Sequence, residues 1–318
     1  MRAVVVGAGS WGSAFACLLR DRGHEVVLAA RDPEHAAAIA ESGRNPRYVP
    51  EADLRGIFAT TIAQAPVAAA DLVAVAVPSR AFGDVVASLP GQAPLLSLSK
   101  GLDPRTGARL TTLVRERPVA VLSGPNIAEE IVRGLPAAAV VASDDLELAV
   151  RIQLAVNSVV FRVYVSDDVA GVELCAAAKN VIALAAGGAD GLALGDNAKA
   201  ALVARGLAEM RRLAESAGAR PDTFAGLAGM GDLIVTCFSP AGRNRRAGEL
   251  IARGASPEEA VAEIGMVVEG LTTAPVLRDL ARRLGIELPI TEGVCAVLEG
   301  VPLIDLVGQL MRREPTTE

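Results

Sequence analysis

The stretch AVVVGAGSWG, residues 3–12, decides the fold of this chain. Its first four residues form a short apolar run that is typical of a buried strand. Gly7, Gly9 and Gly12 follow in the spacing G-x-G-x-x-G, and the apolar spacing of residues 13–21 then indicates a helix. In this context Gly7 permits a tight turn, Gly9 lets the backbone approach a diphosphate, and Gly12 lets the helix pack on the strand. We therefore predict a strand–turn–helix unit that binds a dinucleotide, with a purely structural glycine turn as the alternative.

The residues that close the second apolar run bear on which dinucleotide is bound. A carboxylate at this position hydrogen-bonds the ribose of NAD, whereas an arginine accommodates the extra phosphate of NADP. Here Arg31 precedes Asp32 directly after the run 26–30. Because the arginine comes first, we favour NADP as the cofactor, with NAD or the use of both as the alternative. The non-functional interpretation of Arg31 is a solvated loop charge.

Apolar runs of strand length recur through the first half of the chain. They lie at 3–6, 26–30, 57–60, 72–77, 95–98, 119–122, 137–141 and 159–165. Helical stretches separate several of them, including 13–21 and 145–156. Alternating strands and helices predict crossover units and a largely parallel sheet, which buries both faces and so explains the continuous apolar runs. We therefore predict an α/β fold that begins with a Rossmann-type doubly wound sheet.

The strand signal fades past residue 166. Helical spacing continues at 169–186, 197–217, 258–263, 273–284 and 292–298. The chain thus divides into an α/β part and an all-α part. We predict a dinucleotide-binding domain over 1–166, followed by an all-helical C-terminal domain for substrate binding and catalysis over 167–318.

The composition limits the classes of function. The chain has 318 residues, 51% of them apolar and 21% charged, so it can bury a large core and fits two domains of ordinary size. Its formal net charge of −6 argues against a nucleic-acid-binding surface. The four cysteines are far apart and form no CxxC or Cys/His cluster, so we expect neither a metal site nor a disulfide framework.

The N-terminus imitates a signal peptide, but its apolar run breaks at Gly7. No apolar stretch elsewhere reaches the roughly 18–20 residues that span a bilayer. We therefore expect a cytoplasmic protein without membrane insertion. We also expect a homodimer, because this is the commonest assembly of soluble proteins.

Lysine is scarce, since Lys100, Lys179 and Lys199 are the only lysines among 31 basic residues. Lys179 lies in a helical stretch that is apolar nearly all round, so we expect burial to lower its pKa and to suit it to act as a general base. A lysine that reaches to the helix edge or pairs with Glu173 is the alternative. Lys100 follows the strand 95–98, at the sheet edge where doubly wound folds bind their ligands.

Two polar turns in the second half are further candidates for the site. The turn GMGD, 229–232, follows no strand, so we assign it no dinucleotide, but the carboxylate of Asp232 can orient a lysine or a substrate hydroxyl. The segment SPAGRNRR, 239–246, places Arg243 and Asn244 at the start of a helix. Such a helix start in an acidic protein predicts a local anion site, with a solvated basic helix face as the alternative.

Taken in order, these motifs resemble the bacterial NAD(P)-dependent glycerol-3-phosphate dehydrogenase family over essentially the whole chain. The resemblance is carried by the segments 7–12, 76–79, 97–102, 122–125, 178–181, 190–200, 229–237, 243–246, 267–270 and 288–290. It implies reversible reduction of dihydroxyacetone phosphate, a phosphorylated triose, to sn-glycerol 3-phosphate. The hydride would come from NADH or NADPH, and the product would feed glycerophospholipid synthesis.

The resemblance also implies roles for individual residues. Lys179 would be the proton acceptor, Asp232 would orient it, and Lys100 would contact both cofactor and substrate. The substrate-binding residues would be Lys100, Gly124, Asn126, Lys179, Asp232, Gly242, Arg243 and Asn244. The cofactor-binding residues would be Gly7, Gly9, Ser10, Trp11, Gly12, Arg31, Lys100, Ala128, Arg243, Val267 and Glu269.

Two positions depart from the family pattern. Asn126 stands where the family usually has Ser or Thr, and Gly242 stands where it usually has Ser. Asn126 keeps a hydrogen-bond donor on a longer arm, whereas Gly242 offers only its backbone N–H. These departures leave a sibling dehydrogenase of another hydroxy acid or phosphorylated alcohol as one alternative. A protein that senses NAD(P) without catalysis is the other.

Overall fold

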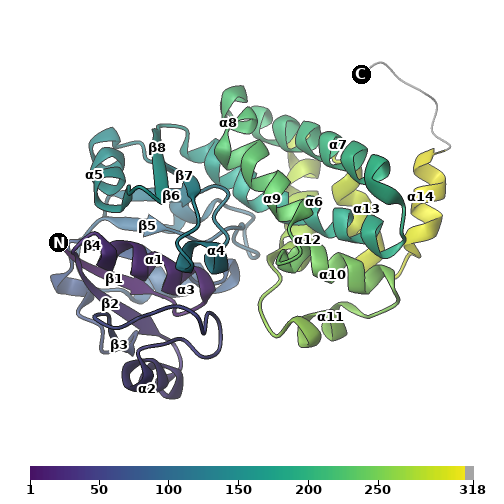
Figure 1. Cartoon of the computed structure of the whole chain (residues 1–318). Coiled ribbons are helices and arrows are strands. Elements are labelled where there is room, and N and C mark those ends of the chain that lie inside the picture. Colours follow the sequence, from purple (N-terminus) through teal and green to yellow (C-terminus); the bar gives the residue numbers. More distant parts are fainter. Residues whose placement is uncertain (312–318) are drawn as a thin grey trace.

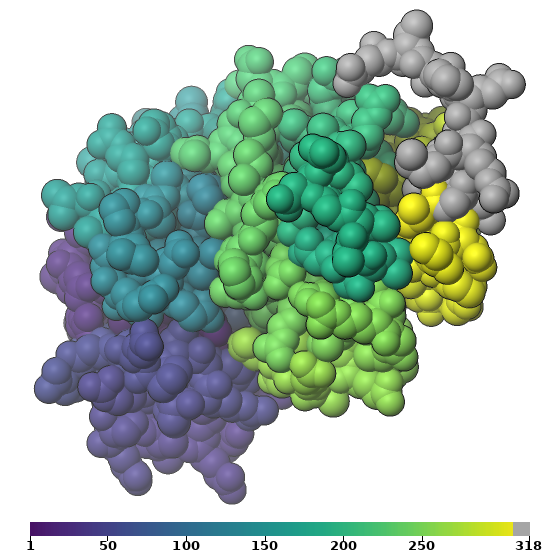
Figure 2. Space-filling model, turned by 45° about the vertical axis from the view of Figure 1, so that its right-hand side comes forward, coloured from purple at the N-terminus to yellow at the C-terminus, as the bar shows by residue number. Residues whose placement is uncertain are grey.

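This computed structural model describes residues 1–311, so the last residues of the predicted second domain, 312–318, lie outside the described part. Figure 1 shows two parts side by side: a sheet with flanking helices, coloured purple to teal, and an assembly of helices, coloured green to yellow. The space-filling view in Figure 2 shows the same two parts in contact. The predicted fold class, α/β followed by all-α, is confirmed.

An eight-stranded sheet forms the first part, in the order β3-β2-β1-β4-β5-β6-β7-β8. Its strands are β1 (Arg2–Val6), β2 (Glu25–Ala30), β3 (Phe58–Thr61), β4 (Leu72–Val75), β5 (Leu95–Ser97), β6 (Val119–Ser123), β7 (Ala137–Ala142) and β8 (Phe161–Ser166). All neighbouring pairs are parallel except β6 with β7. Each strand predicted from an apolar run is present, and its ends differ from the prediction by at most two residues.

The strand order reverses at β1, because β2 lies on one side of it and β4 on the other. In doubly wound sheets the ligand binds at such a reversal, beyond the carboxyl ends of the strands. The loops that follow β1, β4, β5 and β6 all leave the sheet at this edge, since these four strands are parallel. The edge therefore gathers segments that are far apart in the sequence.

Helices cover both faces of the sheet. They are α1 (Ser10–Asp21), α2 (Pro33–Ser42), α3 (Ser79–Ser88), α4 (Ala128–Val132) and α5 (Leu146–Val156), with the 3-10 turns η1 (Val67–Ala69) and η2 (Leu110–Leu113). Val5 of β1 belongs to the core on the α1 face, and Val6 belongs to the core on the α3 face. Such burial on both sides explains why β1 is continuously apolar.

The sequence periodicity predicts α1 and α5 but misses α2 and α3. In α2 only Ala36 and Ile39 are buried, and in α3 only Ser79 and Phe82. A helix with so narrow a buried face leaves little apolar periodicity in the sequence.

Helices alone build the second part. They are α6 (Val169–Gly191), α7 (Gly195–Ser216), α8 (Pro221–Ala225), the π-helical turn η3 (Leu227–Gly231), α9 (Asp232–Phe238), α10 (Arg243–Ala252), α11 (Pro257–Ile264), α12 (Glu269–Leu284), α13 (Pro289–Leu298) and α14 (Leu303–Met311). The helix α6 is central, because α7, α9, α10, α12 and α13 all pack against it.

This central helix corrects one expectation from the sequence. With 23 residues, α6 is long and apolar enough to cross a membrane by length and composition, whereas the sequence predicts no such stretch. The prediction counts uninterrupted apolar residues, and Glu173 and Lys179 interrupt this helix. However, 89% of its apolar window is buried inside the protein. Neighbouring helices therefore cover its apolar surface, as expected for a helix that is apolar all round.

Candidate active site

The glycine-rich turn between β1 and α1 has the geometry that its spacing predicts. Gly7 has a φ of +111°, and a Cβ built on it would lie 2.4 Å from the carbonyl oxygen of Ala76, just after β4. A Cβ on Gly12 would lie 1.9 Å from the carbonyl oxygen of Gly7, so the helix and the turn pack backbone to backbone. A Cβ on Gly9 would meet nothing within 4 Å. The turn thus leaves room beside the N-terminus of α1, where an anion is favoured.

A groove of about 470 Å³ begins at this turn and extends to the helical part. The predicted site residues that line it are Gly7, Gly9, Ser10, Trp11, Arg31, Lys100, Asn126, Ala128, Lys179, Asp232, Gly242, Arg243, Asn244, Val267 and Glu269. Two predicted residues lie just outside its lining. Gly12 packs against the turn, and Gly124, with a φ of +151°, contributes its carbonyl oxygen to Lys100 at 3.1 Å. One groove therefore brings together residues from both parts of the chain.

Asp232 joins two lysines at the centre of the groove. Its Oδ1 lies 2.6 Å from Lys179 Nζ, and its Oδ2 lies 2.8 Å from Lys100 Nζ. Asp232 begins α9, Lys179 lies on α6 and Lys100 follows β5, so three separate elements supply the cluster. The side chain of Lys179 is 6% exposed and that of Asp232 is 2% exposed. Charges this deeply buried require such pairing, and here the pairing holds both ammonium groups at the groove.

The cluster shifts the pKa of two of its members. Burial, reinforced by the charge of Lys179 and opposed by that of Asp232, lowers the pKa of Lys100 from 10.5 to about 7. At Asp232 burial favours the neutral acid, but the charges of both lysines outweigh it and hold the pKa of the carboxyl below its usual range. The site thus has a carboxylate that stays ionised and a lysine that exchanges its proton near neutral pH.

The two alternative interpretations of Lys179 are wrong. Lys179 is buried, so its ammonium does not reach the helix edge. Glu173 is engaged elsewhere, since it accepts hydrogen bonds from the Thr111 N–H at 2.8 Å and from the Arg109 guanidinium at 3.1 Å. Lys179 donates instead to Asp232 and, at 2.9 Å, to the hydroxyl of Thr236.

The residues of the predicted anion site, Arg243 and Asn244, lie at the start of α10. Arg243 is exposed, lines the groove, and donates a hydrogen bond to the carbonyl oxygen of Val267 at 3.1 Å. Asn244 is buried, and its Nδ2 donates to the Oδ1 of Asn180 at 2.9 Å. Its own Oδ1 accepts from the N–H of Gly270 at 2.8 Å. These two hydrogen bonds therefore fix the first turn of α10 to both α6 and α12.

Gly242 directly precedes α10 and has a structural reason to be glycine. A Cβ on Gly242 would lie 2.8 Å from the carbonyl oxygen of Thr236. A serine, which the family usually has here, requires this backbone to shift. The connection between α9 and α10 thus leaves little room for a side chain at this position.

The opposite end of the groove holds Arg31, Asp32 and Trp11. Arg31 is exposed and lines the groove there. Asp32 is engaged as the cap of α2, because its side chain accepts from the Glu34 N–H at 3.0 Å. Trp11 packs edge-on against Phe15, with ring centroids 5.8 Å apart, and its buried Nε1 finds no hydrogen-bond partner among the described residues. Trp11 thus combines packing on the core with a place in the groove lining.

The polar side chains at the site that escaped prediction include Ser79, Ser123, Asn180 and Thr236. Ser123 donates to Asp232 at 3.2 Å, and Ser79 is hydrogen-bonded to Glu269. Only Thr236 leaves a signal in the sequence, because it follows Asp232 by four residues and so shares its helix face. The others meet their partners through the tertiary fold.

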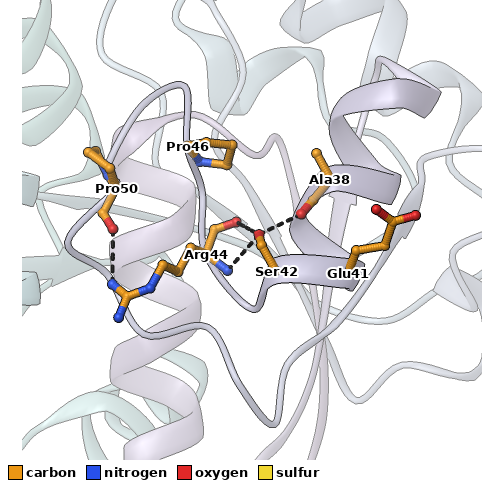
Figure 3. Close-up of a pocket in the computed structure, with 6 residues that line it drawn as sticks. All are labelled: Ala38, Glu41, Ser42, Arg44, Pro46 and Pro50. Atoms are coloured by element: carbon orange, nitrogen blue, oxygen red, sulfur yellow. Dashed lines mark hydrogen bonds between the residues drawn. The ribbon is translucent and has the colours of Figure 1, made fainter.

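A second pocket lies at the end of α2 (Figure 3). It is lined by Ala38, Glu41, Ser42, Arg44, Pro46 and Pro50. The Ser42 hydroxyl donates to the carbonyl oxygen of Ala38 at 2.6 Å and accepts from the Arg44 N–H at 3.2 Å. The Arg44 guanidinium donates to the Pro50 carbonyl oxygen at 3.1 Å. Ser42 and Arg44 are thus bonded within this pocket, and none of the predicted site residues lines it, so the groove is the candidate active site.

Over the described range 1–311, no group of three or more His, Cys, Asp and Glu side chains is arranged to hold a metal ion. The four cysteines are buried free thiols.

Comparison with known proteins shows which family the chain belongs to. Residues 2–149 match a family model described as NAD-dependent glycerol-3-phosphate dehydrogenase N-terminus, and residues 168–306 match the corresponding C-terminus. The chain belongs to this family. It is 48% identical to an NAD(P)+ glycerol-3-phosphate dehydrogenase of Moorella thermoacetica, over 99% of this chain and 96% of that protein. It is 45% identical to the Nocardia farcinica protein of the same name, over 98% of each.

The fold agrees with the family. A crystal structure of glycerol-3-phosphate dehydrogenase from Coxiella burnetii is 35% identical, with a TM-score of 0.94 over 98% of this chain and 99% of that one. The resemblance inferred from the motifs is thus confirmed, and the chain is an NAD(P)-dependent oxidoreductase. The interpretation as a protein that senses NAD(P) without catalysis is wrong.

Proposed function

We propose that this enzyme interconverts dihydroxyacetone phosphate and sn-glycerol 3-phosphate by hydride transfer with a nicotinamide dinucleotide. One observation carries the proposal. Asp232 holds the ammonium groups of Lys100 and Lys179 in the same groove that contains the glycine turn and the start of α10. This groove combines a place for a dinucleotide, a proton-transfer group and an anchor for an anion.

Lys179 is the proton-transfer group of this mechanism. When bound, the nicotinamide supplies or accepts the hydride at the C2 carbon of the substrate. In the oxidation direction neutral Lys179 removes the proton of the C2 hydroxyl, and in reduction its ammonium returns the proton to the C2 oxygen. Asp232 and Thr236 fix the position of its Nζ through hydrogen bonds of 2.6 and 2.9 Å.

The remaining groups bind and orient the substrate. Arg243 and Asn244 anchor the phosphate at the start of α10, so that binding energy from this remote group positions the reacting carbon. Lys100 adds a positive charge between cofactor and substrate. The Nζ of Lys100 donates to the Oδ1 of Asn126 at 2.7 Å, and this hydrogen bond holds the lysine side chain at the sheet edge of the groove.

We favour NADPH over NADH as the reductant. Arg31 follows β2 and lines the groove, while the carboxylate of Asp32 is occupied in capping α2. An arginine at this position accommodates the ribose phosphate of NADP, and a carboxylate engaged elsewhere is less available to the ribose hydroxyl of NAD.

The two domains of the molecule have separate roles. Residues 1–166 form the dinucleotide-binding domain, and residues 167–318 form the domain that binds substrate and carries out catalysis. We propose a cytoplasmic homodimer that acts on a small phosphorylated substrate, takes no nucleic acid as partner, and supplies glycerol phosphate for glycerophospholipid synthesis.

A spectrophotometric assay tests the reaction. Oxidation of NADPH and NADH is followed with dihydroxyacetone phosphate and with a panel of 2-keto acids and other phosphorylated carbonyl compounds. Turnover restricted to the triose phosphate supports the proposal, whereas preference for another substrate favours the sibling dehydrogenase suggested by Asn126 and Gly242.

Substitution of Lys179 tests the mechanism in the same assay. Lys179→Met should lower turnover by about 10²–10⁴, which is the usual contribution of general acid–base catalysis, and should leave NADPH binding intact. Lys179→Arg is the matched control, because arginine keeps the charge beside Asp232 but does not release its proton. Turnover close to that of the wild type in the arginine variant would exclude Lys179 as the proton-transfer group.

A further inference from the structure

The third lysine, Lys199, lies outside the groove but is also buried. Its Nζ is 2.7 Å from the Oδ2 of Asp190, and its side chain is only 9% exposed. Asp190 is near the end of α6, and Lys199 is in the second turn of α7. The segment that contains both residues, DGLALGDNAKA at 190–200, carries part of the family resemblance, yet none of its residues has a role in the proposed mechanism.

Asp190 also binds α10. The Arg245 guanidinium lies 2.7 Å from the same Oδ2 of Asp190 and 3.0 Å from Glu249. The Arg245 side chain is 13% exposed. We call Asp190, Lys199 and Arg245 the α6–α10 cluster. The cluster links the end of α6, the start of α7 and the start of α10.

The α6–α10 cluster contacts the connection between α9 and α10. The Nε of Arg245 donates to the carbonyl oxygen of Ser239 at 3.1 Å, and the same oxygen accepts from the Gly242 N–H at 3.0 Å. Lys199 Nζ lies over the ring of Phe238, 4.8 Å from its centroid. The cluster therefore holds the last residue of α9 and the first residue of the turn that leads into Arg243.

The backbone of α10 is fixed at the same place. A Cβ on Gly187 of α6 would lie 1.8 Å from the carbonyl oxygen of Arg245, so the two helices touch backbone to backbone. Arg245 is therefore held from both ends: its backbone packs on α6, and its guanidinium binds Asp190 one turn further along α6.

Asp190 pairs with both cations of the cluster, and Arg245 pairs in addition with Glu249. Partial burial works against ionisation of Asp190, but its hydrogen bonds and ion pairs with Lys199 and Arg245 outweigh this and hold its pKa below the usual range. Loss of either cation leaves a partly buried carboxylate poorly paired, which favours rearrangement of the connection it supports.

We propose that Asp190, Lys199 and Arg245 are positioning residues that fix the α9–α10 connection and thereby present Arg243 and Asn244 to the substrate phosphate. This inference rests on the proposed function, because it concerns the same phosphate. None of the three residues lines the groove. They act through the backbone between Phe238 and Arg243.

A comparison of two substrates separates this role from a general effect on folding. Asp190→Asn and Lys199→Met are assayed with dihydroxyacetone phosphate and with dihydroxyacetone, which lacks the phosphate. We expect kcat/KM for the phosphorylated substrate to fall roughly tenfold or more, mainly through KM, because small misplacement of a binding group has effects of this size. The kcat/KM for dihydroxyacetone should stay within about twofold of the wild type, since Lys100, Lys179 and Asp232 are unchanged.

Two further variants serve as controls. Lys199→Arg keeps the charge and should restore most of the lost kcat/KM. Arg246→Gln removes an exposed ion pair of the same helix, Arg246 with Glu263 at 2.9 Å, and should behave as the wild type. If Asp190→Asn does not fold, the two Lys199 variants decide the question.

Equal losses with both substrates, or no loss with either, would overturn the positioning role. A wild-type enzyme that turns over neither substrate would contradict the proposed function instead, so the two failures are distinguishable.

Discussion

Glu269 binds Ser79 across the junction of the two parts of the molecule. One carboxylate oxygen accepts from the Ser79 N–H at 3.0 Å and the other accepts from the Ser79 hydroxyl at 2.6 Å. Glu269 begins α12, and Ser79 begins α3 directly beyond the strand reversal of the sheet. A carboxylate at the N-terminus of a helix satisfies a backbone N–H that has no partner within the helix. One side chain of the helical part therefore caps a helix of the sheet part at the groove.

The replacement Glu269→Ala should lower the free energy of unfolding. It leaves the buried N–H and hydroxyl of Ser79 without their acceptor, which costs about 1–3 kcal/mol. Urea unfolding measures the change, and KM for the cofactor should rise with it because Glu269 lines the groove. Glu269→Gln keeps one acceptor and should lose less. An alanine variant as stable as the wild type would show that this contact does not hold the two parts together.

The same residue makes stability depend on pH. Burial, opposed by the hydrogen bonds from Ser79 and by nearby Arg243 and Arg80, raises the pKa of Glu269 above its ordinary value of 4.5. Between 4.5 and the raised value the folded state binds more protons than the unfolded state, so this group's contribution to the free energy of unfolding falls as pH rises. Glu173 and Glu209 are shifted in the same direction, so the difference between wild type and Glu269→Gln isolates the effect. A difference that does not vary with pH would contradict it.

Lys100 should control the pH dependence of substrate binding. Its pKa of about 7 means that the ammonium form dominates below neutral pH and is lost above it. If the charge attracts the anionic substrate, kcat/KM for dihydroxyacetone phosphate should fall above pH 7, approaching about tenfold per pH unit. Lys100→Arg stays charged and should abolish this decline, even at a lower overall rate. The same decline in the arginine variant would assign it to another group.

The parts of this molecule that the sequence predicts are those set by local patterns. Gly7 has the positive φ of a tight turn, Gly12 packs on the backbone of Gly7 within the same strand–turn–helix unit, and β1 is apolar because both of its faces are covered. The same holds for the burial of Lys179, because an apolar helix surrounds it on all sides. In each case the neighbours in sequence already contain the physical reason.

The contacts that tune the site depend on residues far apart in the chain. Lys100 and Asp232 are 132 positions apart, and their pairing exists only because β5 and α9 meet at the groove. The lowered pKa of Lys100 was therefore not predicted, since the sequence does not show that Asp232 contacts both lysines. The contact between Glu173 and Thr111 was not predicted for the same reason, because the two residues are far apart in the sequence.

Arg31 should determine the preference of the enzyme for NADPH over NADH. Arg31→Ala removes the side chain expected to contact the ribose phosphate, and a charge-assisted contact of this kind is worth about 1.5–3 kcal/mol. We expect KM for NADPH to rise roughly tenfold or more, because each 1.4 kcal/mol is a factor of ten, whereas KM for NADH should change little. Initial rates with both cofactors measure the ratio. An equal effect on the two would assign Arg31 to a general role.

Asn126 should set the strength of substrate binding through the group it leaves unpaired. Its Oδ1 accepts from Lys100 at 2.7 Å, while its buried Nδ2 finds no hydrogen-bond partner within residues 1–311. Because Asn126 lines the groove, we expect this unpaired donor to bind the anionic substrate. Asn126→Asp exchanges this donor for a negative charge next to Lys100. KM for dihydroxyacetone phosphate should rise roughly tenfold or more, since losing a buried hydrogen bond costs about 1–3 kcal/mol.

The aspartate in this variant should also move the pH dependence. A carboxylate beside Lys100 favours its ammonium form, so the decline in kcat/KM should begin at a higher pH than in the wild type. Asn126→Ser, which restores a residue usual in the family, keeps a donor and an acceptor on a shorter side chain, and should shift KM less. Steady-state assays across pH measure both effects, with KM for NADPH as the internal control. An aspartate variant whose KM and pH profile match the wild type would show that Asn126 does not face the substrate.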